Sequence, residues 1–256
     1  MTEIWQRLEK HYNAAVAYYG ENSVFGVFHY GSWNYGTNLP DSDVDTKCIL
    51  IPNIRNLALK PFAVNHLHID EEVCECMSIM HMVENWKKQN INFVEIMFTP
   101  YFKLNPMYFD FWSEQDDGKF APYALDLEKS ERVARYDVQK AVLSMAHQAI
   151  NTLKRNPTDL KAIMNGARIA ASLFKLTTTK NSYMNVMKAD RKTANIRTGE
   201  TVLPEGYVDG LIMLFETMIK RAEGGEWAPD KKEQEEVNLL LDNFILDLIN
   251  YRITNE

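Results

Sequence analysis

The sequence has little cysteine and no long hydrophobic run. Its 256 residues include only three cysteines, which are Cys48, Cys74 and Cys76. An odd number and a C-x-C spacing do not fit a disulfide framework, so we expect reduced thiols and a cytoplasmic protein. Because no apolar run approaches the ~18 residues of a membrane span, no membrane partner is expected. Residues 1–20 have the pattern of an amphipathic helix rather than that of a signal peptide.

An overall excess of basic residues is also missing, because the net charge is −7. The charge is unevenly distributed, however. Residues 151–200 contain 10 basic and 3 acidic residues, a local charge of +7, whereas residues 1–150 and 201–256 each carry −7. A basic segment between acidic ones is typical of a surface that faces phosphate groups. The alternative interpretation is a set of solvated helices with scattered lysines.

The apolar pattern divides the chain into two parts. Strands and helices alternate over roughly the first 110 residues, and the pattern is helical from about residue 130. We therefore predict a small domain of strands and helices over residues 1–115 and a helical domain over residues 125–256. The expected strands are 23–31, 44–52 and a segment around 73–77, and the expected helices are 2–19, 32–37, 77–89, 128–155, 158–180, 207–225 and 230–252.

The most informative stretch is YGSWNYGTNLPDSDVDTKCIL, residues 30–50. A Gly-Ser pair, Gly31-Ser32, ends the first strand, and Asp43 and Asp45 stand where the second strand begins. Two carboxylates two residues apart share one face of a strand and repel each other by about 1 kcal/mol or more. Solvent or a bound cation relieves this repulsion. Transfer of a nucleotidyl group needs carboxylates for Mg²⁺ and a small, backbone-rich loop for the triphosphate, and this stretch supplies both.

A third carboxylate is expected on the strand around residues 73–77. Strand alternation places Glu75 on the same face as Val73 and Met77, where a charge is costly to bury without a partner. Glu72 lies in an acidic lead-in and is expected to face water, so we favour Glu75 and keep Glu72 as the alternative.

Two further acidic residues near these segments are assigned mainly structural roles. Asp41 is interpreted as a loop or cap residue. Glu95 lies in an apolar run and is interpreted as a structural partner, with a role in the site as the alternative.

At these motifs the chain resembles a known family. The chain resembles the DNA-polymerase-β-like nucleotidyltransferase superfamily in one pattern. In this pattern a Gly-Ser pair is followed, after about ten residues, by Asp-x-Asp and an apolar strand. The longer pattern GSWNYGTNLPDSDVDTKCI is similar to the RNA-ligase-associated (RlaP) nucleotidyltransferases, as are ECMSIMHMVENWKKQNINFVEIMF and the loop IRTGETVLPEG. The resemblance implies an α+β fold, in which a small mixed-sheet nucleotidyltransferase domain precedes a helical domain.

The resemblance also implies residue roles. Asp43, Asp45 and Glu75 would bind Mg²⁺ or Mn²⁺, and Glu75 would also accept the proton of the attacking hydroxyl. The nucleotide-binding residues would be Gly31, Ser32, Lys161, Arg168 and Arg197.

The spacing within the helical part is informative as well. Lys161, Asn165 and Arg168 are spaced i, i+4, i+7 and so share one helix face, which an ordinary polar surface would also explain. Asn165 departs from the histidine that is usual in the family. Trp33 and Tyr35 are interpreted as core residues, with stacking on a base as the alternative.

The expected reaction is transfer of a nucleoside monophosphate from ATP or another nucleoside triphosphate to an acceptor hydroxyl, with release of pyrophosphate. The resemblance implies an RNA end as the acceptor, in RNA repair, with residues 151–200 as the RNA-facing region. The alternatives are nucleotidylation of a protein side chain or of a small molecule, and an inactive module on the same fold that binds a nucleotide or a partner.

Overall fold

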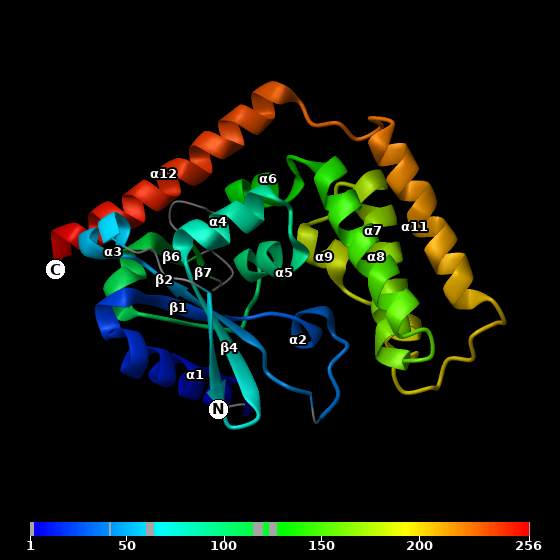
Figure 1. Ribbon diagram of the computed structural model, residues 1–256, viewed down its shortest axis with the longest axis horizontal. Coiled ribbons are helices and arrows are strands. Elements are labelled where there is room, and N and C mark those ends of the chain that lie inside the picture. Colours follow the sequence, from blue (N-terminus) through cyan, green and yellow to red (C-terminus); the bar gives the residue numbers. More distant parts are fainter. Residues whose placement is uncertain (1–2, 41, 60–63, 115–119, 123–126, 256) are drawn as a thin grey trace.

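The chain folds around one mixed β-sheet with helices on both faces, as a computed structural model shows (Figure 1). The structure describes residues 3–40, 42–59, 64–114, 120–122 and 127–255. The secondary structure is of the α+β class, as predicted. The expected boundary between the two parts, residues 115–125, lies largely outside the described residues, and so does Asp41.

The five strands lie in the order β3-β4-β2-β1-β5. Only β2 and β4 are parallel neighbours, and the other pairs are antiparallel, so the sheet is mixed. A separate two-stranded sheet joins β6 and β7. The strands are β1 (Val24–His29), β2 (Thr46–Leu50), β3 (Asn65–Ile69), β4 (Glu72–Ser78), β5 (Phe102–Leu104), β6 (Trp112–Glu114) and β7 (Phe120–Pro122).

Alternation along the strands divides the core between the two faces of the sheet. Cys48 and Leu50 belong to one apolar cluster with helix α1 (Glu3–Tyr19), whereas Ile49 and Ile51 belong to the cluster that contains helix α4 (Ile79–Lys87). In β4, Cys74 and Cys76 face α1 and Met77 faces α4, as the predicted alternation requires. All three cysteines are buried and free.

The second half of the chain is helical, as predicted. Helix α7 (Val138–Arg155) packs against both α8 (Leu160–Thr178) and α11 (Tyr207–Glu223). The other helices are α2 (Ser32–Tyr35), α3 (Ile54–Leu59), α5 (Ile91–Val94), α6 (Leu127–Arg135), α9 (Tyr183–Met187), α10 (Arg191–Ala194) and α12 (Lys231–Asn255), with 3₁₀ turns η1 (Glu21–Ser23), η2 (Glu95–Met97) and η3 (Pro106–Phe111).

The single helix expected over residues 128–155 is in fact two helices, α6 and α7. Asp137 interrupts the pattern, because its backbone is non-helical and its carboxylate accepts a hydrogen bond from Lys140 N at 2.9 Å. This is the arrangement of an N-cap, which begins a new helix. Asp159 caps α8 similarly, since its carboxylate accepts a hydrogen bond from Lys161 N at 2.8 Å.

Helix α12 leaves the helical part and returns to the sheet part, where it lies along the top of Figure 1 above α4. Phe244 of α12 packs on Trp86 of α4 with a centroid distance of 6.0 Å, and Asp242 pairs with Lys87 at 2.7 Å. Arg252 donates a hydrogen bond to the carbonyl of Ile51 just after β2. The long C-terminal helix therefore joins the two parts, and one buried apolar cluster runs through both.

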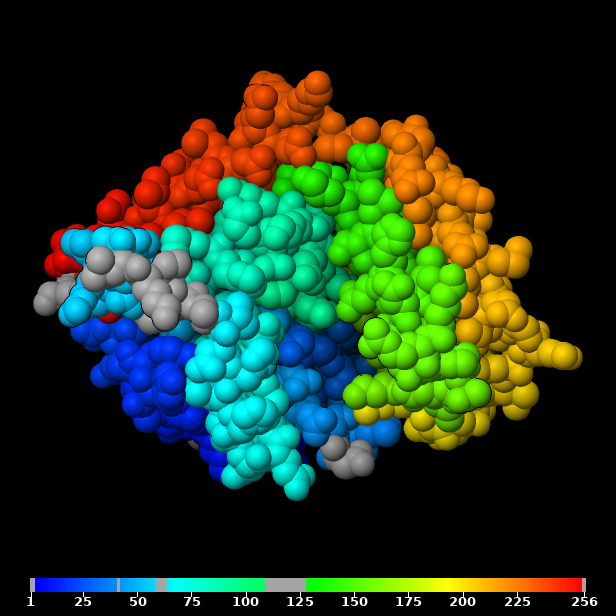
Figure 2. Space-filling view, viewed as in Figure 1, coloured from blue at the N-terminus to red at the C-terminus, as the bar shows by residue number. Residues whose placement is uncertain are grey.

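The space-filling view shows how these segments meet on one face of the molecule (Figure 2). The red α12 covers one edge, and the green α7 and α8 lie beside the blue and cyan sheet part. Among the described residues, no helix combines the length and the apolar character needed to cross a membrane.

The docking of α12 gives the first prediction. We expect Phe244→Ala to lower the free energy of unfolding by about 3–5 kcal/mol, because it removes a fully buried ring at the contact with Trp86. Leu246→Ala on the same helix is the control, since Leu246 is 56% exposed and its loss costs at most about 0.5 kcal/mol. Urea denaturation of both variants tests this, and equal effects would contradict the docking.

Candidate functional site

A glycine with a positive φ places the loop that follows β1. Gly31 has φ 99° and ψ −142°, a conformation that residues with a Cβ rarely adopt. Ser32 follows it and begins the single turn α2, as predicted. The Gly31 N–H donates a hydrogen bond to Glu95 Oε2 at 3.1 Å, so the loop is anchored to a segment 64 residues away.

Glu95 is the buried anchor of this loop. Its side chain is fully buried, and its Oε2 also accepts a hydrogen bond from Asn34 Nδ2 at 3.2 Å. Thr99 Oγ1 in turn donates to Asn34 Oδ1 at 2.7 Å. Burial raises the pKa of Glu95 above its ordinary value, although the hydrogen bonds from Gly31 and Asn34 favour the ionised form. The structural interpretation of Glu95 is therefore confirmed.

The two aspartates lie at the entry of β2, one or three residues before the strand begins. Asp43 is exposed and Asp45 is half-buried. The carbonyl of Asp45 accepts a hydrogen bond from Tyr30 N at 3.2 Å, which extends the pairing of β1 with β2. Burial and the nearby charge of Asp43 raise the pKa of Asp45. A divalent cation at this pair would offset both effects.

Glu72 has a structural role that the sequence did not predict. We expected it to face water, but only 12% of its side chain is exposed. Its Oε1 accepts a hydrogen bond from Val44 N at 2.9 Å, and its carboxylate forms an ion pair with Arg7. His11 links Glu72 at 3.1 Å to Thr46 Oγ1 at 2.7 Å. Helix α1 and Glu72 thus hold the backbone on which both aspartates stand.

Glu75, the expected third carboxylate, is bonded to Lys47 Nζ. The described residues contain no group of three or more His, Cys, Asp or Glu side chains placed to hold a metal ion. The structure therefore brings Asp43 and Asp45 together but does not add Glu75 to them.

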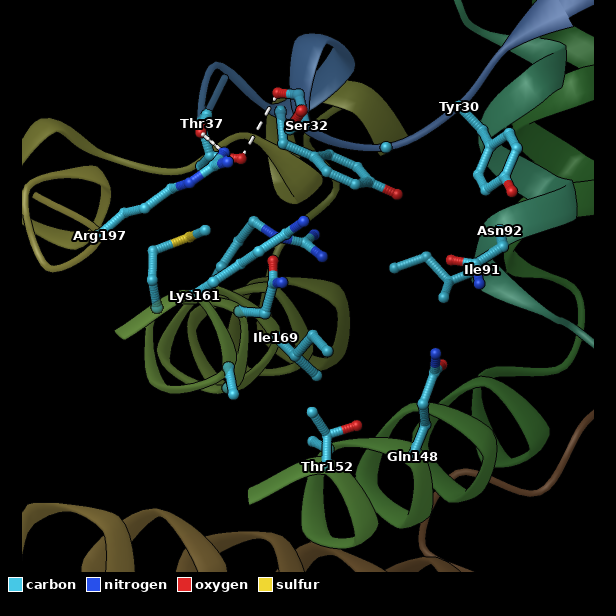
Figure 3. A pocket seen from close by; sticks show the side chains of 18 of the residues that line it. Tyr30, Ser32, Thr37, Ile91, Asn92, Gln148, Thr152, Lys161, Ile169 and Arg197 are labelled. Atoms are coloured by element: carbon cyan, nitrogen blue, oxygen red, sulfur yellow. Dashed lines mark hydrogen bonds between the residues drawn. The ribbon is translucent and has the colours of Figure 1, made fainter. Parts of the chain in front are cut away.

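A cavity of about 210 Å³ lies between the sheet part and the helical part. Ser32 and Thr37 face it from one side together with Lys161 and Arg197, and Tyr30, as Figure 3 shows, faces it from the opposite side. It brings together six of the eight predicted site residues, which are Gly31, Ser32, Lys161, Arg168, Arg197 and, from the aspartate pair, Asp45. Asp43 and Glu75 do not line it.

The cations of this cavity come from the helical part. Lys161, Asn165 and Arg168 all line it from α8, so the predicted shared face is confirmed. Arg168 is only 5% exposed, and its guanidinium carbon lies 3.7 Å from the centroid of the Tyr35 ring. Its Nε and Nη1 atoms are buried and have no hydrogen-bond partner among the described residues. Arg197 Nη1 donates to the carbonyl of Thr37 at 2.6 Å, which ties the loop at residue 197 to the loop after α2.

Sequence reasoning missed the polar residues on the other side of the cavity. Asn92 on α5, and Gln148 and Thr152 on α7, face the cavity together with Ile91 (Figure 3). Gln148 and Thr152 are spaced i, i+4, which is also the spacing of any solvated helix face. Nothing local distinguishes them from other surface residues.

The two aromatic side chains of α2 are mainly structural, because Tyr35 is buried in the core and Trp33 packs on Tyr101 with a centroid distance of 6.4 Å.

No model of a known protein family matches the chain, and no curated protein matches it either. The case for a function therefore rests on the residues and on the geometry of the site.

The Glu72 contacts give the second prediction. We expect Glu72→Ala to lower the free energy of unfolding by about 1–3 kcal/mol, because it removes the acceptor of Val44 N and one ion pair of Arg7. Chemical denaturation measures this effect. Glu71→Ala is the control, since Glu71 is the exposed neighbour. If both substitutions had the same small effect, Glu72 would not hold the aspartate segment.

Glu95 gives the third prediction, which concerns pH. The pKa of Glu95 in the folded protein is raised above its ordinary value of 4.5. Between the pKa of the unfolded state and that of the folded state, the folded protein retains a proton that the unfolded chain has released. Stability therefore falls as the pH rises through this range. Glu95→Gln removes this titration. We expect the stability of the variant relative to the parent to increase as the pH rises above about 4.5 and to be constant below it.

Urea denaturation at several pH values measures this difference. Glu84→Gln at an exposed position of α4 is the control and should show no such trend. A difference that moved in the opposite direction would mean that the folded protein favours the ionised form of Glu95.

Proposed function

We propose that the protein is a Mg²⁺-dependent nucleotidyltransferase with a DNA-polymerase-β-like catalytic part. An acceptor hydroxyl attacks the α-phosphate of a nucleoside triphosphate, and pyrophosphate leaves. The observation that carries the proposal is the cavity in which Gly31-Ser32 and Asp45 meet the cations of α8 and of the loop at residue 197. These residues come from segments more than 100 positions apart, and only the fold brings them together.

Asp43 and Asp45 are the residues that would hold the metal. Their carboxylates are hard oxygen donors two residues apart, and Mg²⁺ in such sites takes one or two carboxylates and completes its shell with phosphate oxygens and water. Mn²⁺ suits the same donors. When bound, the ion neutralises the charge that develops on the phosphate oxygens.

The cations of the cavity suit a triphosphate. Arg168 is a buried charge with two unpartnered nitrogens, and such a charge is costly unless an anion pairs with it. Lys161 is exposed at the same cavity and adds a mobile ammonium group. Ser32 adds a hydroxyl, and the neighbouring Gly31 allows close approach of the backbone. Together these groups would bind and orient the β- and γ-phosphates, which is most of what phosphoryl-transfer catalysis requires.

The far side of the cavity suits the nucleoside. Asn92 and Gln148 carry amides that both donate and accept hydrogen bonds, and Ile91 and Ile169 supply apolar surface. Ligand sites commonly combine such apolar walls with a few polar groups. In Figure 3, Asn92 lies on the side of the cavity away from Arg197.

An RNA end is the acceptor that the chain supports best. The cavity is built on the segment 151–200, whose local charge is +7, and that segment also carries exposed cations such as Arg155, Arg191 and Lys192 outside the cavity. Basic surface around a nucleotide site favours a polyanionic acceptor. Nucleotidylation of a protein, or of a small molecule, is the second candidate, and it uses the same nucleotide site.

Nucleotide transfer gives the fourth prediction. We would incubate the parent and Asp43→Asn/Asp45→Asn with each α-labelled nucleoside triphosphate, Mg²⁺ or Mn²⁺, and mixed RNA. We expect label on RNA that falls by a factor of about 10³ or more in the variant, because the phosphate charge is no longer neutralised. Asp209→Asn/Asp247→Asn, at two exposed helical positions, is the matched control and should retain full activity.

The same assay separates the alternatives. Label on protein alone would move the acceptor to a side chain. If no nucleotide were transferred and nucleotide binding did not depend on the metal ion, the proposed enzymatic activity would be contradicted. The protein would then be an inactive binding module.

A further inference from the structure

Lys47 and Glu75 form an ion pair across the two parallel strands of the sheet. Lys47 of β2 is the register partner of Glu75 of β4, and its Nζ is hydrogen-bonded to Glu75 Oε2. The Lys47 side chain is 3% exposed and that of Glu75 is 20% exposed. Both stand on the sheet face that carries Ile49 and Met77, and Lys47 lies two residues after Asp45.

Two aromatic rings complete the surroundings of the Lys47 ammonium. Its Nζ lies 4.1 Å from the centroid of Tyr30 and 4.2 Å from that of Phe93. A lysine buried to this extent is costly unless its charge is paired, and Glu75 is the only carboxylate among the described residues that forms an ion pair with it. The rings add cation–π attraction but no countercharge. The need for Glu75 therefore follows from Lys47 alone, without a metal ion.

The Lys47–Glu75 pair also contacts residues that form the cavity. Tyr30 lines the cavity, and its N–H donates a hydrogen bond to the Asp45 carbonyl at 3.2 Å. The Lys47 ammonium packs against the Tyr30 ring, and Lys47 itself stands two residues after Asp45. The ion pair thus fixes the strand end that presents Asp45 and the loop that presents Ser32.

We propose that Glu75 is a positioning residue and not a metal ligand, and that the site takes a single divalent cation, held by Asp43 and Asp45. The carboxylate of Glu75 is committed to Lys47, so it supplies neither a second metal site nor a base for the attacking hydroxyl. The cation half of this inference rests on the proposed function. The pairing half stands on the contacts of Lys47 alone.

A double-variant cycle tests the proposal. The variants are Lys47→Met, Glu75→Leu and the double variant that carries both changes. For each variant we would measure Tm, the affinity for Mn²⁺ alone by calorimetry, and nucleotide transfer. We expect each single change to lower Tm by about 10 °C, because it leaves one buried charge or one buried polar partner uncompensated. The double variant replaces both by apolar groups, and its Tm should return to within about 3 °C of the parent.

The double variant decides the role of Glu75, because it has no carboxylate at position 75 but retains a packed core. If Glu75 is only a positioning residue, the Mn²⁺ affinity of the double variant stays within about threefold of the parent and its transfer rate within about tenfold. The dependence of the transfer rate on Mn²⁺ concentration then fits a single binding site. If Glu75 is a ligand or a base, the double variant is stable but loses transfer by a factor of about 10²–10⁴, and the proposal is overturned. Failure of the double variant to recover Tm would overturn it as well.

Lys10→Met/Asp70→Asn is the matched control cycle. Lys10 and Asp70 pair at 3.2 Å, but their side chains are 63% and 73% exposed, so this cycle should show almost no coupling. A parent protein that bound no Mn²⁺ would contradict the proposed function and the cation half of the inference together. The Tm cycle would then still decide whether Glu75 serves to compensate Lys47.

Discussion

The buried carboxylate of Glu95 is the constraint on which the rest of the site depends. A carboxyl group without solvent contact must find its hydrogen-bond donors within the chain, and Glu95 takes them from Gly31 N and Asn34 Nδ2. The guanidinium of Arg168 is close enough to favour its ionised form, and it stacks on the Tyr35 ring. Glu95 therefore anchors the loop after β1, and the stacking of Tyr35 on Arg168 connects α2 with helix α8. The position of the Gly31-Ser32 loop relative to the cations of α8 is therefore set in the core and not at the surface.

Much of the fold could be predicted because the apolar period of a long segment indicates whether it forms a helix or a strand. Helices α1, α8 and α11 and strands β1 and β2 lie where their apolar periods place them. Short elements such as α3, β3, α9 and α10 were missed, since four to six residues carry too little periodicity and are held by tertiary contacts. The return of α12 to the sheet could not be predicted either. Its apolar face specifies burial, but the choice of Trp86 as the partner of Phe244 is a property of the whole fold.

The site shows the same division between local and long-range information. Gly31-Ser32 and the shared face of Lys161, Asn165 and Arg168 are local patterns, and the structure places them as expected. Glu72 was misjudged because its partners, Arg7 and His11, lie more than 60 residues away on α1. The Lys47–Glu75 pair leaves a signal in the sequence. Two charges of opposite sign each interrupted an apolar strand, and parallel neighbours with matched interruptions can compensate each other.

The uneven charge of the sequence has its explanation at the boundary between the two parts. The acidic first part presents Asp43 and Asp45 just before the central strand β2, and the basic segment 151–200 places Lys161, Arg168 and Arg197 at the cavity that Asp45 lines. Neither set is fully compensated within its own part, since Asp45 is disfavoured as a charge by burial and by Asp43, and Arg168 keeps unpartnered nitrogens. Under the proposed function, a metal-bound polyphosphate would offer a cation to the first set and anionic oxygens to the second. Because α12 and the common core fix both parts in one body, this complementarity is built into the folded chain before any ligand arrives.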